Sequence, residues 1–290
     1  MARQRELRVL VATDGSRDAK AAIATTLHFP WPARTQVRVM SAQRTRADYR
    51  RSTLLSALDV GAKKAAESAR RTLSRRWPDV DIEILDKPPV EGILGEAERF
   101  QADVIVVGWR GHGAVRRLLM GSVSRGVVRG STCAVLVVRR SQRVRTIVFG
   151  VDGSEAAKRA LAFVGRLAPP RGGRVTLVSA VELLKPPSRG RIPGAATIAR
   201  EVRRQNTVRT RAARKDLDRA AAELKRTGWQ PRTMLVHGEP LRDLLGAVAA
   251  SRAQLLVVGA RGSSGVRYLL LGSVAEGALN QSPVAVLVAR

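Results

Sequence analysis

Gly108-Trp109-Arg110-Gly111 opens a motif that closes nine residues later with Gly121-Ser122, and the chain repeats it as Gly259-Ala260-Arg261-Gly262 and Gly272-Ser273. Glycine occupies 25 of the 290 positions, so one such match is uncommon by chance and two in the same register are far rarer. The repetition therefore indicates a duplicated unit.

The residues around each motif are repeated as well. An apolar run near the start of each half leads into Asp14-Gly15-Ser16 in the first half and Asp152-Gly153-Ser154 in the second. Each half also ends on a second apolar run, at residues 134–138 and 284–288. Because these features recur in the same order, we predict that the chain is two copies of one domain.

We place the two domains at residues 1–140 and 141–290. The segment Arg139–Arg145 between them is short and basic, so we expect a linker without a core element that keeps the domains in contact. The Asp-Gly-Ser copies lie 138 positions apart and the glycine motifs 151 apart, so the second half carries thirteen extra residues. The proline- and glycine-rich stretch Lys185–Gly194 predicts that they form an exposed loop.

The composition is that of a globular protein, with 44% hydrophobic and 26% charged residues. Its single cysteine, Cys133, permits neither an intramolecular disulfide nor a thiolate cluster for a metal ion, which fits a reducing, cytoplasmic location. No apolar run approaches the roughly 20 residues that cross a bilayer, so we expect neither export nor membrane insertion.

The net charge of +28 comes from 52 basic and 24 acidic residues. Such a field attracts nucleic acid, polyphosphate or an anionic membrane surface. It also arises without any ligand when an arginine-rich composition replaces lysine at solvated positions. Aromatic residues are only 3% of the chain, which weakens the case for a platform that stacks single-stranded bases. Nucleic-acid binding therefore stays an alternative to the main prediction below.

Apolar runs alternate with segments of helical period in both halves. In the first half we predict strands at Leu7–Thr13, Gln36–Ala42, Val80–Leu85, Asp103–Gly108 and Ala134–Val138, and helices at Asp18–Leu27, Ser52–Trp77, Val90–Phe100 and Ser122–Gly130. The second half repeats the strands near Thr146–Val151, Arg174–Val181, Gln230–Val236, Gln254–Gly259 and Val284–Val288. This alternation predicts the α/β class, with two tandem open-sheet domains of five parallel strands and four helices each.

The glycine motifs and the aspartates lie where such sheets bind ligands, beyond the carboxyl ends of the central strands. Glycine lets backbone N–H groups approach a phosphate, and each Gly-Ser pair opens a helix whose N-terminus favours an anion. Positive charge surrounds these loops at Arg110, Arg116, Arg117, Arg261 and Arg267. A single glycine is equally an ordinary turn or cap, and Asp14 and Asp152 fit a helix N-cap, a ligand contact or both.

At these residues the chain resembles the universal stress protein family, in particular its ATP-binding branch, whose signature is G-x2-G-x9-G-[ST]. The resemblance covers essentially all of both halves, including the aspartate after the first strand. It implies the tandem type and an adenine nucleotide alpha hydrolase-like fold with strand order 3-2-1-4-5. It also implies that the last strands, 135–138 and 284–288, pair within the chain.

The resemblance further implies which residues bind ATP. Asp14 and the backbone at Ala42 meet the adenine and ribose, whereas the glycine loop and the following helix hold the phosphates. The implied positions are Ala12, Asp14, Ala42, Val107, Gly108, Gly111, Gly121, Ser122 and Val123 in the first half, and Gly150, Asp152, Ala180, Val258, Gly259, Gly262, Gly272, Ser273 and Val274 in the second. Mg²⁺ accompanies the nucleotide and is held mainly through its phosphates.

Three functions remain open. The first is a nucleotide-dependent stress-response or signalling regulator, in which ATP biases conformation or the choice of an unidentified protein partner. The second is a slow ATPase or phosphotransferase that uses His112 or a loop arginine, although the sequence lacks a Walker lysine loop. The third is nucleic-acid binding through the positive charge. Trp109 and His112 replace the small Ala260 and Ser263, so we expect unequal nucleotide sites, and the chain can also form a homodimer.

Overall fold

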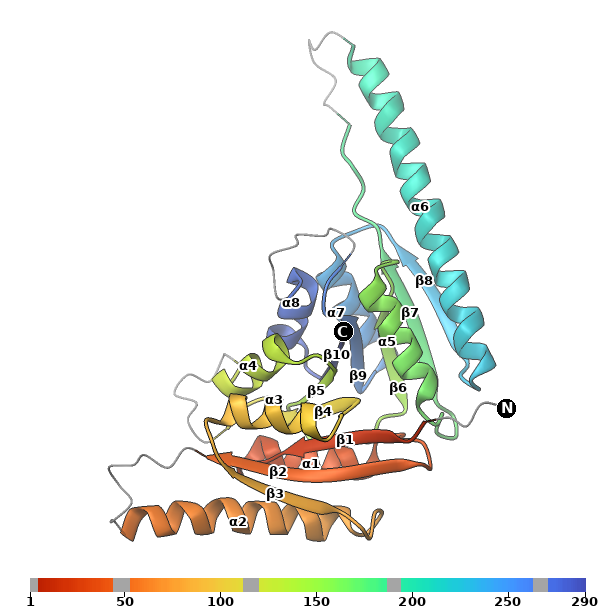
Figure 1. Ribbon diagram of the computed structural model, residues 1–290. Helices are drawn as coiled ribbons and strands as arrows, with labels where there is room; N and C mark the ends of the chain where they lie inside the picture. The colour runs from red at the N-terminus through yellow and green to blue at the C-terminus, as the bar shows by residue number, and fades with distance from the viewer. Residues whose placement is uncertain (1–4, 44–52, 112–119, 187–193, 263–270) are drawn as a thin grey trace.

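The computed structural model describes residues 5–43, 53–111, 120–186, 194–262 and 271–290 (Figure 1). In the first half its elements are β1 (Leu7–Ala12), α1 (Arg17–His28), β2 (Thr35–Gln43), α2 (Thr53–Leu73), β3 (Asp81–Asp86), α3 (Pro89–Arg99), β4 (Val104–Gly108), α4 (Ser122–Gly130) and β5 (Ala134–Val138). The second half contains β6 (Thr146–Gly150), α5 (Glu155–Arg166), β7 (Arg174–Ala180), α6 (Ala195–Arg226), β8 (Pro231–Val236), α7 (Pro240–Ser251), β9 (Leu255–Gly259), α8 (Ser273–Gln281) and β10 (Ala285–Ala289). The predicted α/β class and the tandem organisation are confirmed.

The strands form one continuous sheet of ten, in the order β3-β2-β1-β4-β5-β10-β9-β6-β7-β8. The five-stranded sheets of the two domains are therefore joined into one, through the pairing of the last strands that the family resemblance implied. The sheets merge because β5 and β10 pair in antiparallel register, with Leu136 opposite Leu287 and Val137 opposite Val286. Each of these strands would otherwise expose a fully apolar edge, and pairing satisfies the backbone groups of both. All other pairings in the sheet are parallel.

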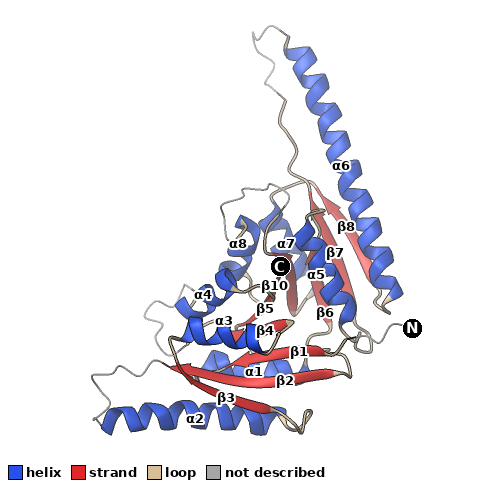
Figure 2. Ribbon diagram, in the orientation of Figure 1, coloured by secondary structure: helices blue, strands red, loops and turns tan. Residues whose placement is uncertain are grey.

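Helices cover both faces of the sheet (Figure 2). Helices α1, α2, α5 and α6 contribute to one buried cluster, and α3, α4, α7 and α8 contribute to the other. The central strands β4, β5 and β10 are buried along their whole length, as expected for strands covered on both sides. The apolar runs in the sequence are thus the middle layer of a three-layer sandwich.

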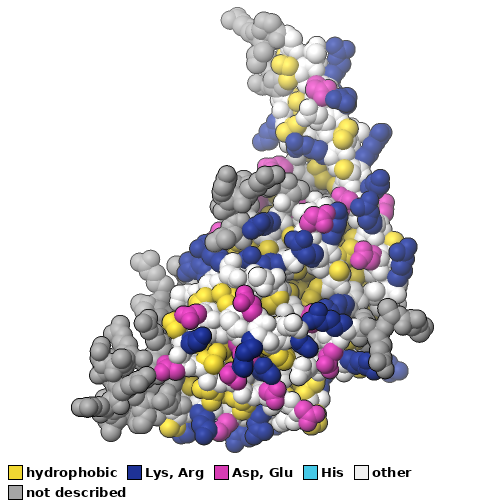
Figure 3. Space-filling view, in the orientation of Figure 1, with side chains coloured by type: hydrophobic (Ala, Val, Ile, Leu, Met, Phe, Trp, Pro, Cys, Tyr) yellow, Lys and Arg dark blue, Asp and Glu magenta, His cyan; other side chains and the backbone are white. Residues whose placement is uncertain are grey.

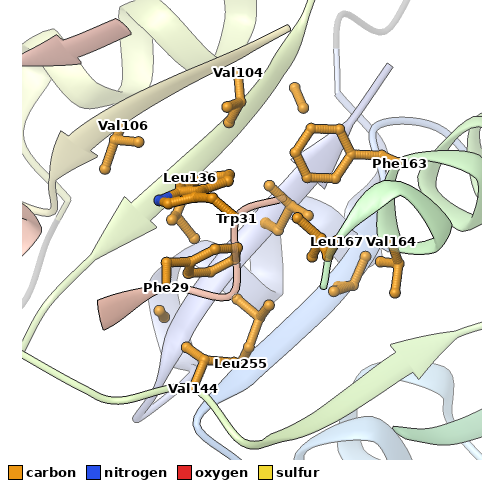
Figure 4. Packing of buried hydrophobic residues seen from close by; sticks show 14 of the residues in the cluster. Phe29, Trp31, Val104, Val106, Leu136, Val144, Phe163, Val164, Leu167 and Leu255 are labelled. Atoms are coloured by element: carbon orange, nitrogen blue, oxygen red, sulfur yellow. The ribbon is translucent and has the colours of Figure 1, made fainter. Parts of the chain in front are cut away.

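One hydrophobic cluster spans both halves of the chain. At its centre the rings of Phe29 and Trp31 lie 4.2 Å apart and pack beside Phe163 and Leu167 of the second half (Figure 4). The segment between the halves also contributes, because Val144 is buried in this cluster. The linker, whose residues are all described, carries no helix or strand, as predicted, but Val144 anchors it in an interior that the two domains share.

The extra residues of the second half are placed differently from the prediction. Most of them lengthen a helix, because α6 has 32 residues whereas its counterpart α2 has 21. Only Leu217, Ala220 and Leu224 of α6 are fully buried, and the N-terminal part of the helix extends beyond the sheet (Figure 1). The predicted loop was read from Pro and Gly between 185 and 194, of which residues 187–193 lie outside the described part.

Within the described residues, no helix combines the length and the apolar character that a membrane span requires.

Candidate functional site

A pocket of about 120 Å³ opens at the carboxyl ends of β1, β2 and β4 in the first half. Seven of the nine positions predicted there line it: Ala12, Asp14, Ala42, Val107, Gly108, Gly111 and Val123. Of the side chains that the prediction did not place in the nucleotide site, the pocket adds Thr13, Ala19, Met40, Pro89, Ile93, Arg110 and Ser124. Gly121 and Ser122 do not line it, but they are the cap and first residue of α4, whose next two residues, Val123 and Ser124, do. Residues far apart in sequence thus converge beside the glycine loop.

The turn after β1 presents a carboxylate and begins a helix. Ser16, not Asp14, is the N-cap of α1, because its hydroxyl accepts a hydrogen bond from the Ala19 N–H at 3.3 Å. Asp14 instead accepts the N–H of Ser16 at 2.9 Å across Gly15, whose φ of 80° suits glycine. The capping alternative for Asp14 is therefore wrong, and its carboxylate is held toward the pocket.

The glycines of the motif serve close packing. A Cβ at Gly108 would lie 2.6 Å from the Asp18 carbonyl carbon, so only glycine lets α1 approach the end of β4. A Cβ at Gly111 would collide with the Asp14 carboxylate. Gly121 donates its N–H to the Trp109 carbonyl at 2.9 Å, which brings the two ends of the motif together. Asp14, Gly111 and Gly121 are consequently neighbours although the chain separates them.

Helix α4 begins at the pocket with its N-terminus uncapped by a side chain. Its N-cap is Gly121, and no described side chain caps the first-turn N–H groups. The Ser124 hydroxyl donates to the Gly108 carbonyl at 2.6 Å and fixes the helix against β4. An uncapped N-terminus of a nine-residue helix offers free N–H donors and a partial positive charge to an anion.

The second half repeats this geometry. Ser154 caps α5 through the Ala157 N–H at 3.1 Å, and Asp152 accepts the Ser154 N–H at 3.0 Å. Gly272 donates to the Ala260 carbonyl at 2.8 Å and caps α8 without a side-chain bond. The remaining predicted positions end the strands or begin α8: Gly150 in β6, Ala180 in β7, Val258 and Gly259 in β9, Gly262 beside Asp152, and Ser273 and Val274 in α8.

The two halves differ, but not as Trp109 led us to expect. Trp109 is buried and donates its indole N–H to the Leu279 carbonyl at 2.9 Å, so its ring faces α8 rather than the pocket. Its bulk therefore does not narrow the first site. The halves differ instead at the helices α3 and α7, which both begin with a proline. Counted from these prolines, Gly92 of the first half corresponds to Asp243 of the second, so the second half carries a carboxylate where the first has a glycine. His112, Arg116, Arg117, Ser263 and Arg267 lie outside the described residues.

Two arginines join the halves reciprocally. Arg139, after β5, donates to the carbonyls of Leu279 and Asn280 in the last turn of α8. Arg290, after β10, donates to the carbonyls of Val128 and Arg129 in α4, at 2.6 and 2.7 Å. Cations favour helix C-termini, so each arginine anchors the helix that starts at the other half's glycine loop. Burial and then the charge of Arg110 lower the pKa of Arg139 to about 10.

The capping role of Ser154 leads to a prediction about stability. Ser154→Ala is expected to lower the free energy of unfolding by about 1 kcal/mol, because an Ala157 N–H loses its partner. Ser154→Asp should retain most of this energy, since aspartate is also a strong N-cap. Urea unfolding without nucleotide measures both variants. Equal losses in the two variants would contradict the capping role.

Comparisons with known proteins agree with this architecture. The sequence model described as "Universal stress protein family" matches residues 7–139 and 143–290. Universal stress protein Rv2005c of Mycobacterium tuberculosis is 30% identical over 243 residues, which cover 78% of this chain and 72% of that protein. Universal stress protein Rv2623 of the same organism is 29% identical over 226 residues, covering 73% and 69% respectively.

A solved structure shows the same fold over nearly the whole chain. The crystal structure of a universal stress protein from Archaeoglobus fulgidus superimposes with a TM-score of 0.69 at 19% identity, covering 98% of this chain and 96% of that one. The family match to each half, the mycobacterial relatives and the shared fold point to the same assignment. The chain belongs to the universal stress protein family and carries two of its domains in tandem.

Proposed function

We propose that the protein binds ATP in the first-half pocket, and at the corresponding place in the second half, and acts as a nucleotide-dependent regulator. The observation that carries the proposal is the convergence of Asp14, Gly111 and the uncapped N-terminus of α4 at one pocket. This combination supplies N–H donors and space for phosphates beside a carboxylate that can accept hydroxyl hydrogens.

The pocket divides into an apolar and a polar part. Met40, Ala42 and Ile93 form an apolar wall suited to a base, whereas Arg110 and Gly111 lie on the side of the α4 N-terminus. Its volume of about 120 Å³ is below the roughly 300–1,000 Å³ of pockets that enclose drug-sized ligands. We therefore place the base inside it and the phosphates at the open rim along Gly111, Gly121 and Ser122.

The magnesium ion would be held by the nucleotide rather than by a protein cage. The described residues contain no group of three or more His, Cys, Asp or Glu side chains that could coordinate a metal. Mg²⁺ commonly combines one or two carboxylates with substrate phosphates and water, so the Asp14 carboxylate is compatible with a metal bound mainly through ATP. The ion would neutralise phosphate charge at the rim.

A nucleotide bound at either site would act on the other half of the protein through the helix that begins at that site. Phosphates at the N-terminus of α4 would stabilise that helix, and its C-terminus is tied to Arg290 of the other half. Helix α8 is tied to Arg139 in the same way. Binding at one glycine loop would thereby bias the interface between the halves, which is how a binding protein without catalysis regulates a partner.

Calorimetric titration with Mg²⁺ and ATP tests the proposal directly. We expect saturable binding of ATP, with AMP bound more weakly because it lacks the outer phosphates. Ser122→Ala removes a hydroxyl donor and should weaken ATP roughly 2- to 10-fold without changing thermal stability. Ser68→Ala, an exposed position on α2, serves as the control. Wild-type protein that fails to bind ATP would end the nucleotide proposal.

A further inference from the structure

A second, larger pocket lies at the opposite edge of the sheet, where β6, β7 and β9 begin. Its volume is about 580 Å³, and no strand of the first half lines it. The lining is dominated by arginines from the interdomain segment, the turn before β7 and the end of α7: Arg143, Arg145, Arg171, Arg174 and Arg252. We call this feature the arginine pocket.

The five guanidinium groups gather without compensating charge. All five residues are exposed, and none forms an ion pair with any residue in the described part of the chain. On the face seen in Figure 3, by contrast, basic side chains are spread among acidic ones. Five like charges around one hollow repel each other, and an anion bound among them would relieve that repulsion.

The backbone beneath the arginines is held in place. The Arg174 N–H donates to the Arg145 carbonyl at 2.9 Å, which fixes the start of β7 beside β6. The Gln254 side chain accepts the N–H groups of Arg145 and Thr146 at 3.0 and 2.9 Å, and it donates to the Arg252 carbonyl at 2.6 Å. The arginines therefore project from a connected frame rather than from independent loops.

The first half is less basic at the corresponding positions, where it carries three arginines, Arg5, Arg8 and Arg34, together with Asp103, against five arginines and no carboxylate in the second. At the corresponding positions it carries Gln36 in place of Arg174 and Gln101 in place of Arg252, and both Gln101 and Arg252 have the same left-handed backbone, with φ of 52° and 50°. Arg145 and Arg171 likewise correspond to Leu7 and Ala33. Both halves are thus basic here, and the second carries two more arginines than the first and no carboxylate.

The second half has also lost a carboxylate at this place. In the first half Asp103 accepts the Arg8 N–H at 2.8 Å and pairs with Arg166 at 2.8 Å. The equivalent residue is Gln254, which makes the same kind of backbone contact with a neutral side chain. The exchange removes the negative charge that would compete with a bound anion.

We propose that the arginine pocket binds a chain of phosphate groups, either inorganic polyphosphate or the phosphate tail of a nucleotide. Guanidinium groups bind phosphate oxygens through paired, charge-assisted hydrogen bonds. The volume of 580 Å³ accommodates several linked phosphates, and the lining contains no aromatic side chain on which a base could stack. The site is separate from the nucleotide pocket and does not depend on the proposed function.

Titration with sodium tripolyphosphate at physiological salt tests this site. We expect the triple variant Arg171→Gln, Arg174→Gln and Arg252→Gln to weaken tripolyphosphate binding at least about thirtyfold, because each substitution removes charge-assisted hydrogen bonds. The matched control removes the same charge from exposed positions of α6: Arg203→Gln, Arg211→Gln and Arg214→Gln. Its affinity should stay within about threefold of wild type, since distant surface charges are screened.

The comparison ligands distinguish the sources of the phosphate chain. If ATP binds as tightly as tripolyphosphate in the Gly121→Val, Gly272→Val background and AMP does not, the pocket takes a nucleotide's phosphate tail. Binding of tripolyphosphate alone identifies a free polyphosphate site. Equal losses in the two arginine triples, binding lost with the glycine substitutions only, or no tripolyphosphate binding by the wild type would overturn the proposal.

Discussion

Trp31→Ala is expected to lower the free energy of unfolding by about 3–5 kcal/mol, the largest loss of stability that we predict for a single substitution. The Trp31 side chain is among the largest that are fully buried, and its ring packs on Phe29 at 4.2 Å between centroids. Its indole N–H also donates to the Thr26 carbonyl at 2.9 Å. Truncation would therefore leave a cavity and remove one of the two hydrogen bonds that the Thr26 carbonyl accepts, the other coming from the Phe29 N–H at 3.3 Å.

Because Trp31 packs against residues of the second half, we expect its substitution to destabilise both halves together. Its cluster includes Phe163 and Leu167, and the Ala168 N–H donates to the Pro30 carbonyl at 2.9 Å. Urea unfolding followed by far-UV circular dichroism should show one transition that moves as a whole. Trp77→Ala is the control, because Trp77 is only partly buried at the periphery of the cluster and should cost clearly less. Two separate transitions, or equal losses at both tryptophans, would contradict a shared core.

Gly121→Val is expected to weaken ATP binding in the first half by about two orders of magnitude. A Cβ at this position would lie 3.3 Å from the Trp109 carbonyl and the Arg110 Cα, and the branched side chain would fill the rim where we place the phosphates. Several charge-assisted hydrogen bonds at roughly 1.5–3 kcal/mol each would be lost together. Calorimetry with Mg²⁺ and ATP measures the change.

Matched variants separate this effect from a loss of folding. Gly95→Val introduces the same side chain on the exposed face of α3, where no atom lies within 4 Å, and should leave ATP affinity unchanged. Gly272→Val should remove the second site in the same way, and the double variant should remove both. Gly121→Ala, which adds only the Cβ, provides a milder test if the valine variant unfolds. An unaltered affinity in a folded Gly121→Val protein would exclude the α4 N-terminus as the phosphate site.

The arginine contacts between the halves connect the first site to helix α8 of the second half. Arg139 lies over the Trp109 ring at 3.6 Å, and Arg110 lies over it at 4.0 Å. An anion near Arg110 would relieve the repulsion between these two guanidinium groups, because both are positive and both lie against the same ring. The Trp109 ring therefore contacts both Arg110 of the first site and Arg139, which binds the last turn of α8.

Much of the fold and of the first site could be predicted from the residues alone. The strands and helices of the first half end within a few residues of their predicted bounds, because apolar period and helix caps are local properties. The convergence of Asp14, Gly108 and Gly111 followed from the rule that ligands gather at the carboxyl ends of parallel strands. The role of Ser16 as the cap depends on rotamers that the sequence does not specify.

The sequence by itself determined the duplicated α/β unit, its strand and helix segments and the placement of its glycine loops, because each depends on the order and spacing of nearby residues. Only the tertiary structure decided that Val144 joins an interior shared by both halves, that Trp109 faces α8, and that five arginines surround one pocket. These features depend on which distant backbones pair and how their side chains are then directed, and that choice is made by packing across the whole molecule.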